Sequence, residues 1–143
     1  PPIAPHIAAA EVNLELNVSD LIEHSLLAIN NPADIYLIEG FGGWHAPLNM
    51  RETMADYAVQ LNCEVVIVVG LRVGCLNHAI LTAHAVQASG ARCLGWIANM
   101  IDPQMTHQQE NIMTLESWLQ LSLLGVVRHG EASAAALSQH TIF

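Results

Sequence analysis

Short apolar runs rich in β-branched residues alternate along this chain with stretches whose apolar residues recur every three or four positions. Four runs lack polar alternation, at residues 35–38, 64–70, 93–99 and 123–127. Such runs are typical of strands in a parallel sheet that is covered on both faces. Helical patterns occupy the intervals, at residues 7–11, 19–28, 53–61, 77–89 and 108–119. Strands that alternate with helices predict an α/β fold with a layered parallel sheet.

Residues with known capping preferences set the expected helix boundaries. Ser19 is a good N-cap for the helix at 19–28, which Asn30-Asn31-Pro32 would end. Gly90 would close the helix at 77–89. No repeat, low-complexity tract or linker interrupts the 143 residues, so we expect a single α/β domain over residues 1–143.

Composition narrows the classes of function. Hydrophobic residues make up 52% of the chain, which is ample for a buried core. A net charge of -9 with only four basic residues argues against a nucleic-acid partner or an anionic membrane surface. The three cysteines lie in apolar segments, as reduced thiols do, and no apolar run could span a bilayer. We therefore expect a cytoplasmic protein.

The run at 35–38 ends in a carboxylate and a glycine-rich loop, Glu39-Gly40-Phe41-Gly42-Gly43. Ligands of open parallel sheets bind beyond the carboxyl ends of the strands, so Glu39 would enter that crevice. The glycines would let backbone N–H groups approach an anion, and a carboxylate beside a phosphate implies magnesium. The alternative is that Glu39 caps a turn and the glycines only serve a tight loop.

The loop after residues 64–70 reads Leu71-Arg72-Val73-Gly74-Cys75-Leu76-Asn77-His78 and leads into a helix. A helix N-terminus there would offer free N–H groups to a carboxylate or a phosphate. The alternative is an ordinary connection in which Asn77 caps the helix.

Asn99 ends another expected strand, where its amide could pair with both a donor and an acceptor on an adenine edge, although loop asparagines also form turns. The eight histidines are scattered, and His78 and His84 lack the spacing of a helical metal pair. Glu52 and Asp56 lie one helical turn apart, which more often marks a solvated face than an acid–base pair.

Taken together, these loops resemble those of dethiobiotin synthetase, the ATP-dependent enzyme of biotin synthesis. The most specific matching element is Gly70-Leu71-Arg72-Val73-Gly74-Cys75-Leu76-Asn77-His78. The other matching segments are 2–6, 39–44 with Pro47-Leu48, Leu81-Thr82, 95–99 and 123–125.

The resemblance implies a three-layer parallel sheet of the P-loop nucleotide hydrolase type. It implies a ligase that carboxylates 7,8-diaminopelargonate with CO2 and closes the ring at the expense of ATP, which yields dethiobiotin, ADP and phosphate. By the same resemblance, Glu39 would bind Mg²⁺. The residues implied around ATP are Glu39, Gly40, Phe41, Gly42, Asn99, Met100, Val127, Arg128 and His129.

The resemblance also implies that Gly74, Cys75, Leu76 and Asn77 offer amides to the carboxylate of diaminopelargonate across a homodimer interface. The family's first strand, its phosphate loop ending in Gly-Lys-Thr and its catalytic lysine have no counterpart, because the chain contains no lysine. No catalytic residue is therefore assigned. We expect the C-terminal portion of a longer enzyme, which would be silent alone.

Two positions depart from the family pattern: Phe41 replaces a small residue, and residues 127–129 replace a segment that commonly carries proline. A second hypothesis is a non-catalytic α/β subunit or a ligand-binding scaffold that pairs with another chain. A third, a related partitioning or cobyrinate-type ATPase, is disfavoured by Gly74-Cys75-Leu76-Asn77-His78.

Overall fold

The computed structural model describes residues 3–130, which fall into two compact units. The first unit ends at Cys63 and the second begins at Glu64. The expectation of one α/β domain over residues 1–143 stays a prediction. Among residues 3–130, no helix is long and apolar enough to cross a membrane.

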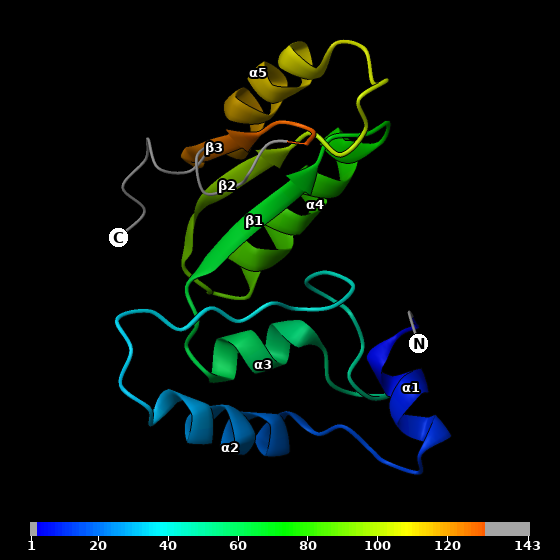
Figure 1. Ribbon diagram of the computed structural model, residues 1–143, viewed down its shortest axis with the longest axis vertical. Coiled ribbons are helices and arrows are strands. Elements are labelled where there is room, and N and C mark those ends of the chain that lie inside the picture. The colour runs from blue at the N-terminus through cyan, green and yellow to red at the C-terminus, as the bar shows by residue number, and fades with distance from the viewer. Residues whose placement is uncertain (1–2, 131–143) are drawn as a thin grey trace. The chain divides into compact units, whose positions relative to one another are not determined.

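The first unit contains three helices, α1 (Pro5–Glu11), α2 (Val18–Ile29) and α3 (Met54–Gln60) (Figure 1). Its core is a cluster of the buried residues Val18, Leu48 and Tyr57. The hydroxyls of Ser25 on α2 and Tyr57 on α3 lie 2.6 Å apart and form a hydrogen bond. This bond joins the two helices beside the apolar cluster. The helical patterns that predicted these elements are confirmed.

The predicted N-cap of α2 is wrong by two positions. The helix begins at Val18, and its N-cap is Asn17 rather than Ser19. The reason lies outside the helix, because the amide of Val18 donates a hydrogen bond of 3.1 Å to Oε2 of Glu52. Asn49 Nδ2 donates to the same oxygen at 2.7 Å. Glu52 therefore fixes the start of α2 instead of lying on a solvated face.

Residues 35–38 were predicted to form a buried strand, and this is wrong for the described structure. The segment has no strand partner among the described residues, and its side chains are exposed. Leu37 is 92% exposed. An apolar run becomes a strand only when another strand satisfies its amides and carbonyls, so sequence pattern alone is not sufficient.

The second unit is a parallel three-stranded sheet with two helices. Its elements are β1 (Val65–Gly70), α4 (Cys75–Ala88), β2 (Cys93–Asn99), α5 (Gln108–Leu119) and β3 (Leu123–Val127). The strand order is β1-β2-β3, and both pairs are parallel. The predicted α/β class is confirmed. The strand predictions for 93–99 and 123–127 are confirmed at both ends, and the predicted run 64–70 differs only at its first residue.

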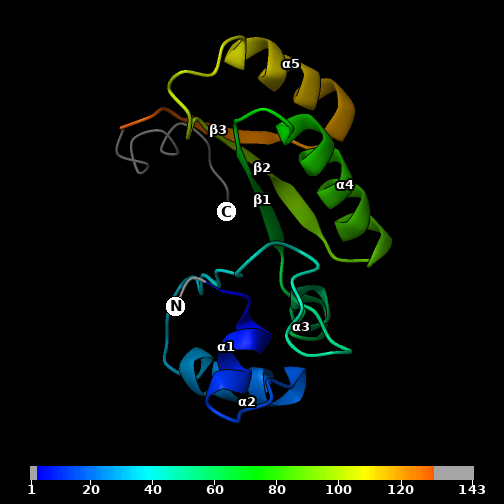
Figure 2. The same cartoon turned by 90° about the vertical axis from the view of Figure 1, so that its right-hand side faces the viewer.

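One face of the sheet is buried beneath α4 and α5, which lie on the same side (Figure 2). Burial alternates along the strands because only one face is covered. The buried residues are Ile67 and Val69 on β1 and their register partners Trp96 and Ala98 on β2. Neighbouring Val68 is 60% exposed. The second helical layer of the predicted three-layer arrangement is not seen on this unit in residues 64–130.

The approach of β2 to β3 requires a glycine at position 95. A Cβ added there would lie 2.4 Å from the carbonyl oxygen of Ser122 and 2.8 Å from Cγ of Leu124. The amide of the next residue, Trp96, donates a 2.9 Å hydrogen bond to the same carbonyl. A side chain at position 95 would therefore push β3 away and break the start of the ladder.

The helix predicted from Asn77 begins two residues earlier, at Cys75, with Gly74 as its N-cap. Gly74 adopts a φ of 93°, which lies in the left-handed region that glycine tolerates. Asn77 is therefore inside the first turn, and the alternative that it caps the helix is wrong.

Helix α3 begins at a capping box formed by Thr53 and Asp56. The hydroxyl and the amide of Thr53 both donate to Oδ2 of Asp56 at 2.7 Å. The hydroxyl bond is the largest cause, and the amide bond the next, of a lowered pKa for Asp56. A carboxyl whose folded pKa is lowered stabilises the fold above its unfolded pKa, and this contribution is lost as the pH falls through the folded pKa.

Substituting Thr53→Ala should lower the free energy of unfolding by about 1 kcal/mol at neutral pH, because it removes the cap. The difference from the unsubstituted protein should shrink below about pH 4, where the unfolded carboxyl becomes protonated. Urea unfolding at pH 7 and pH 3 measures both values. Thr106→Ala, at an exposed threonine, is the matched control and should change stability by less than about 0.5 kcal/mol. An equal loss at both pH values would contradict this account of the cap.

Candidate functional site

The glycine-rich loop of the first unit presents an uncommitted carboxylate. Glu39 is exposed, and it makes no hydrogen bond or ion pair within the described part of the chain. Gly42 and Gly43 have φ values of 82° and 98°, so the backbone here requires glycine. Phe41, which precedes Gly42, is 65% exposed. The loop therefore offers a carboxylate to a cation and a glycine backbone that an anion can approach closely, as a site for both ions requires.

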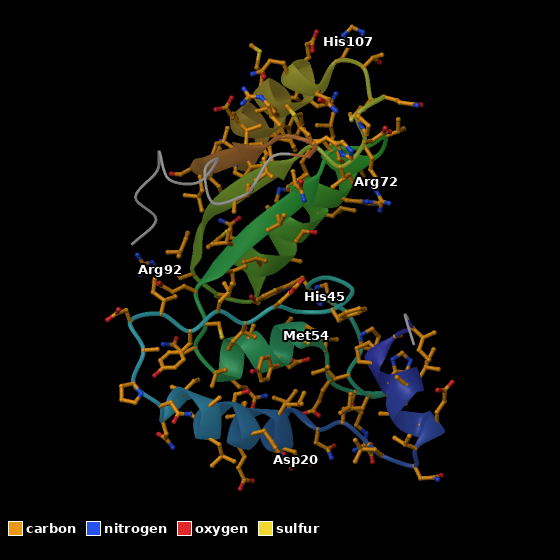
Figure 3. The ribbon with its side chains drawn as sticks, viewed as in Figure 1. Asp20, His45, Met54, Arg72, Arg92 and His107 are labelled. Carbon is orange, nitrogen blue, oxygen red and sulfur yellow. The ribbon has the colours of Figure 1, made fainter. Side chains whose placement is uncertain are left out.

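The end of this loop is held by α3. The amide of Ala46 donates to the carbonyl of Gly43 at 3.1 Å, and the amide of Met54 donates to the carbonyl of Ala46 at 2.9 Å. A Cβ added to Gly40 would lie 3.2 Å from Cε of Met54. Figure 3 labels His45, in the loop just before Ala46, and Met54, the first residue of α3. The glycine loop therefore ends against the start of α3, and no strand precedes it among the described residues.

At the carboxyl edge of the sheet, hydrogen bonds bring together residues that the family resemblance placed around ATP. The amide of Met100 donates to the carbonyl of Val127 at 2.8 Å. Asn99 is the register partner of Val127. The carbonyl of Asn99 also accepts hydrogen bonds from the amides of Leu71 at 2.7 Å and Ile101 at 2.9 Å. The ends of all three strands therefore meet at one edge.

The side chain of Asn99 at this edge has spare hydrogen-bonding capacity. The amide group of Asn99 is half-buried and makes no hydrogen bond among residues 3–130. Arg128 and His129 follow β3 directly and are exposed. A free amide of this kind can donate and accept at once, as recognition of a purine edge requires.

The start of α4 offers backbone donors at the same edge. In residues 3–130, the amides of Leu76 and Asn77 have no hydrogen-bond acceptor. The amide of His78 is already used by the carbonyl of Gly74, at 3.2 Å. Free first-turn amides and the positive end of the helix dipole attract an anion. Exposed Arg72 lies in the connection from β1 to α4 (Figure 3) and adds a positive charge.

Sequence reasoning did not single out Asn111, which supports the same helix start. Sγ of buried Cys75 lies 3.9 Å from Oδ1 of Asn111, within range of a weak hydrogen bond. Nδ2 of Asn111 donates to the carbonyl of His107 at 2.8 Å. Asn111 thereby links the first residue of α4 to the beginning of α5. No local pattern could reveal this contact, because it joins residues 36 positions apart.

The predicted site residues belong to two different units. The segment from Glu39 to Gly42 lies in the first unit, whereas 74–77, 99–100 and 127–129 all lie in the second. Within the second unit, the predicted nucleotide and substrate segments share the carboxyl edge of the sheet. Among the described residues, no three histidine, cysteine or acidic side chains are grouped as a metal site would need. Glu39 alone still suits Mg²⁺, which is often held by one or two carboxylates together with phosphate oxygens and water.

Curated relatives match almost the whole chain. The chain is 44% identical over 141 residues to a protein of Pseudomonas aeruginosa (strain UCBPP-PA14), and the match covers 98% of the chain and 62% of that protein. A protein of Nitrosospira multiformis is 44% identical over 131 residues, with coverages of 92% and 58%. One of Xanthomonas axonopodis pv. citri is 41% identical over 139 residues, with coverages of 97% and 62%.

All three relatives bear the name ATP-dependent dethiobiotin synthetase BioD. The resemblance to this enzyme that the motifs indicated is thereby confirmed. The chain spans about three fifths of the length of these relatives.

The model of a protein family described as an AAA domain matches residues 1–136. This match includes the glycine loop, the start of α4 and the carboxyl ends of all three strands. The chain therefore belongs to this AAA domain family.

Proposed function

We propose that this chain is part of a dethiobiotin synthetase, which carboxylates 7,8-diaminopelargonate with CO2 and closes the ring with the use of ATP. The observation that carries the proposal is the gathering of Asn99, Met100 and Val127 at the edge where α4 begins. The name of the relatives supports the same reaction. A nucleotide-binding edge beside free helix amides suits an enzyme that holds ATP and a carboxylate substrate together.

In the proposed site, Glu39 is a ligand of Mg²⁺, and the loop to Gly42 lines the phosphates. The magnesium ion, when bound, would neutralise charge that develops on the phosphoryl group. Asn99 and Met100 face the adenine, and residues 127–129 border it. Support comes from the exposed, unpaired carboxylate of Glu39 and from the free amide group of Asn99.

The proposed place of diaminopelargonate is the start of α4. The carboxylate tail of the substrate would accept hydrogen bonds from the amides of Leu76 and Asn77, which have no acceptor among residues 3–130. Because the chain has no lysine, these backbone donors are a natural way to hold an anion here. In the proposed enzyme, the segment 74–77 serves the active site of a second subunit in a homodimer.

The chemistry of the reaction requires groups beyond this chain. A carbamate must form on the diamine, receive the γ-phosphoryl group of ATP, and then be attacked by the second amine with loss of phosphate. Cationic side chains are the usual means of stabilising such transferred phosphate, and the chain has four arginines and no lysine. We therefore propose that the remaining two fifths of the enzyme supplies the phosphate-binding and catalytic lysines.

Substituting Glu39→Gln in the full-length protein should lower kcat for diaminopelargonate-dependent phosphate release by about 100-fold or more, because a neutral amide is a poor magnesium ligand. A phosphate-release assay with ATP, Mg²⁺, bicarbonate and the diamine measures the effect. Glu23→Gln removes an exposed negative charge from α2 and should leave kcat unchanged. Full activity of the Glu39 variant would refute the assignment of the metal ligand. A full-length protein without turnover would favour the non-catalytic scaffold.

Substituting Leu76→Pro should raise KM for diaminopelargonate about tenfold and leave KM for ATP unchanged. Proline removes one free amide and is tolerated in the first turn of a helix. Steady-state kinetics with each substrate varied in turn separates the two constants. Leu76→Ala keeps the amide and shortens the same side chain, so it should behave like the unsubstituted enzyme. An equal rise in both KM values would mean that the proline disturbs the edge generally.

A further inference from the structure

The side chain of Glu52 binds other parts of the first unit instead of facing solvent. Its Oε2 accepts a hydrogen bond of 3.1 Å from the amide of Val18 and one of 2.7 Å from Nδ2 of Asn49. A hydrogen bond to an ionised carboxylate is stronger than one between two neutral groups. The half-buried Glu52 side chain therefore joins the start of α2 to the segment that leads into α3.

Asn49 completes this arrangement. Its Oδ1 accepts hydrogen bonds from the amides of Arg51 and Glu52, both at 2.8 Å. Its Nδ2 donates to Glu52 and also, at 2.7 Å, to the carbonyl of Leu16. A side-chain amide has two donor hydrogens and an oxygen that accepts two hydrogen bonds. All of these positions are occupied, so the amide is held in one orientation. We call Asn49 and Glu52 the clamp.

The clamp fastens the two ends of a short loop to the core of the first unit. The amide of Leu48 donates to the carbonyl of Glu52 at 2.8 Å, and Pro47 forms an antiparallel bridge with Thr53. Leu48 is 3% exposed and packs in the apolar cluster with Val18. The hydrogen bonds of the clamp and the packing of Leu48 therefore fix the backbone that enters α3.

The glycine loop lies against the residue that follows this bridge. The amide of Met54 donates to the carbonyl of Ala46 at 2.9 Å, and Cε of Met54 lies 3.2 Å from the place that a Cβ on Gly40 would take. Gly40 directly follows Glu39 in the chain. Because the clamp fixes the start of α3, a change in the clamp would move the backbone beside the Glu39 carboxylate.

We propose that Asn49 and Glu52 are positioning residues for the magnesium ligand Glu39. The inference rests on the proposed function, in which Glu39 binds Mg²⁺ beside the phosphates of ATP. Mg²⁺ requires nearly ideal octahedral geometry, so a carboxylate on a glycine-rich loop must be held in place to serve it. The clamp itself binds neither the metal nor the nucleotide. Residues that orient a metal ligand typically change metal affinity by about 10–100-fold when they are substituted.

Calorimetric titration of the full-length protein with ATP tests the proposal. Asn49→Asp keeps the oxygen that accepts from the amides of Arg51 and Glu52, but it removes both donated bonds and places a second carboxylate against Glu52. It should raise Kd for ATP about tenfold in the presence of Mg²⁺, and by less than about twofold with EDTA. Asn62→Asp makes the same change at an exposed asparagine and should leave both constants unchanged. Equal weakening with and without Mg²⁺ would overturn the inference.

A double-variant cycle separates positioning from a general loss of structure. In the Glu39→Gln protein the clamp has no metal ligand to orient, so adding Asn49→Asp should change Kd for ATP with Mg²⁺ by less than about twofold. A further tenfold rise would overturn the inference, and so would Glu39→Gln alone leaving this Kd unchanged. A protein that binds ATP as expected but does not turn over diaminopelargonate would count against the proposed reaction alone.

Variants of Glu52 provide a rescue test. Glu52→Gln keeps an oxygen that can accept from Val18 and Asn49, so it should raise Kd for ATP with Mg²⁺ less than about threefold. Glu52→Ala removes both bonds and should raise it about tenfold. Equal effects of the two substitutions would contradict a role for the accepting oxygen. Circular dichroism establishes that each variant is folded, and if Glu52→Ala is not, Asn49→Asp and its control decide the question.

Discussion

The parallel ladder of β1, β2 and β3 is the constraint on which the rest of the second unit depends. It places Gly70 beside Asn99 and Asn99 beside Val127, so three connections that are distant in sequence leave the sheet at one edge. The ladder is made possible by Gly95, where any side chain would meet the backbone of Ser122. Glu64 and Arg92, an exposed ion pair, lie just before the first residues of β1 and β2.

The proposed binding of anionic ligands by an acidic chain must draw on its backbone. With a net charge of -9 and no lysine, side-chain cations are scarce. The described structure offers unpaired amides at the start of α4 and a glycine loop with left-handed backbone at Gly42 and Gly43. Fixed peptide dipoles attract an anion without adding net charge. Because backbone amides would hold the anions, the carboxylate of Glu39 remains available to bind a cation.

Sequence pattern was sufficient for strands that have a partner among residues 3–130 and failed for a run that has none there. The β-branched runs at 93–99 and 123–127 formed strands because each has a neighbour. The equally apolar run at 35–38 has none in the described structure and stays exposed. Helix starts were missed where a remote group decides them, as Glu52 does for Val18. At the candidate site, the positions of Asn99 and Val127 at strand ends could be predicted, but the contact between Cys75 and Asn111 required the fold.

We propose that the carboxyl edge of the sheet binds a nucleotide. Amide NMR shifts of the full-length protein, recorded with and without Mg²⁺ and ATP, test it most directly. We expect the largest shift changes in the second unit at residues 99–100 and 127–129, and much smaller changes at Cys93 and Leu123, which begin their strands about 13–20 Å away. Larger changes at Cys93 and Leu123 than at Met100 and Val127, or no changes at saturating ATP, would contradict the account.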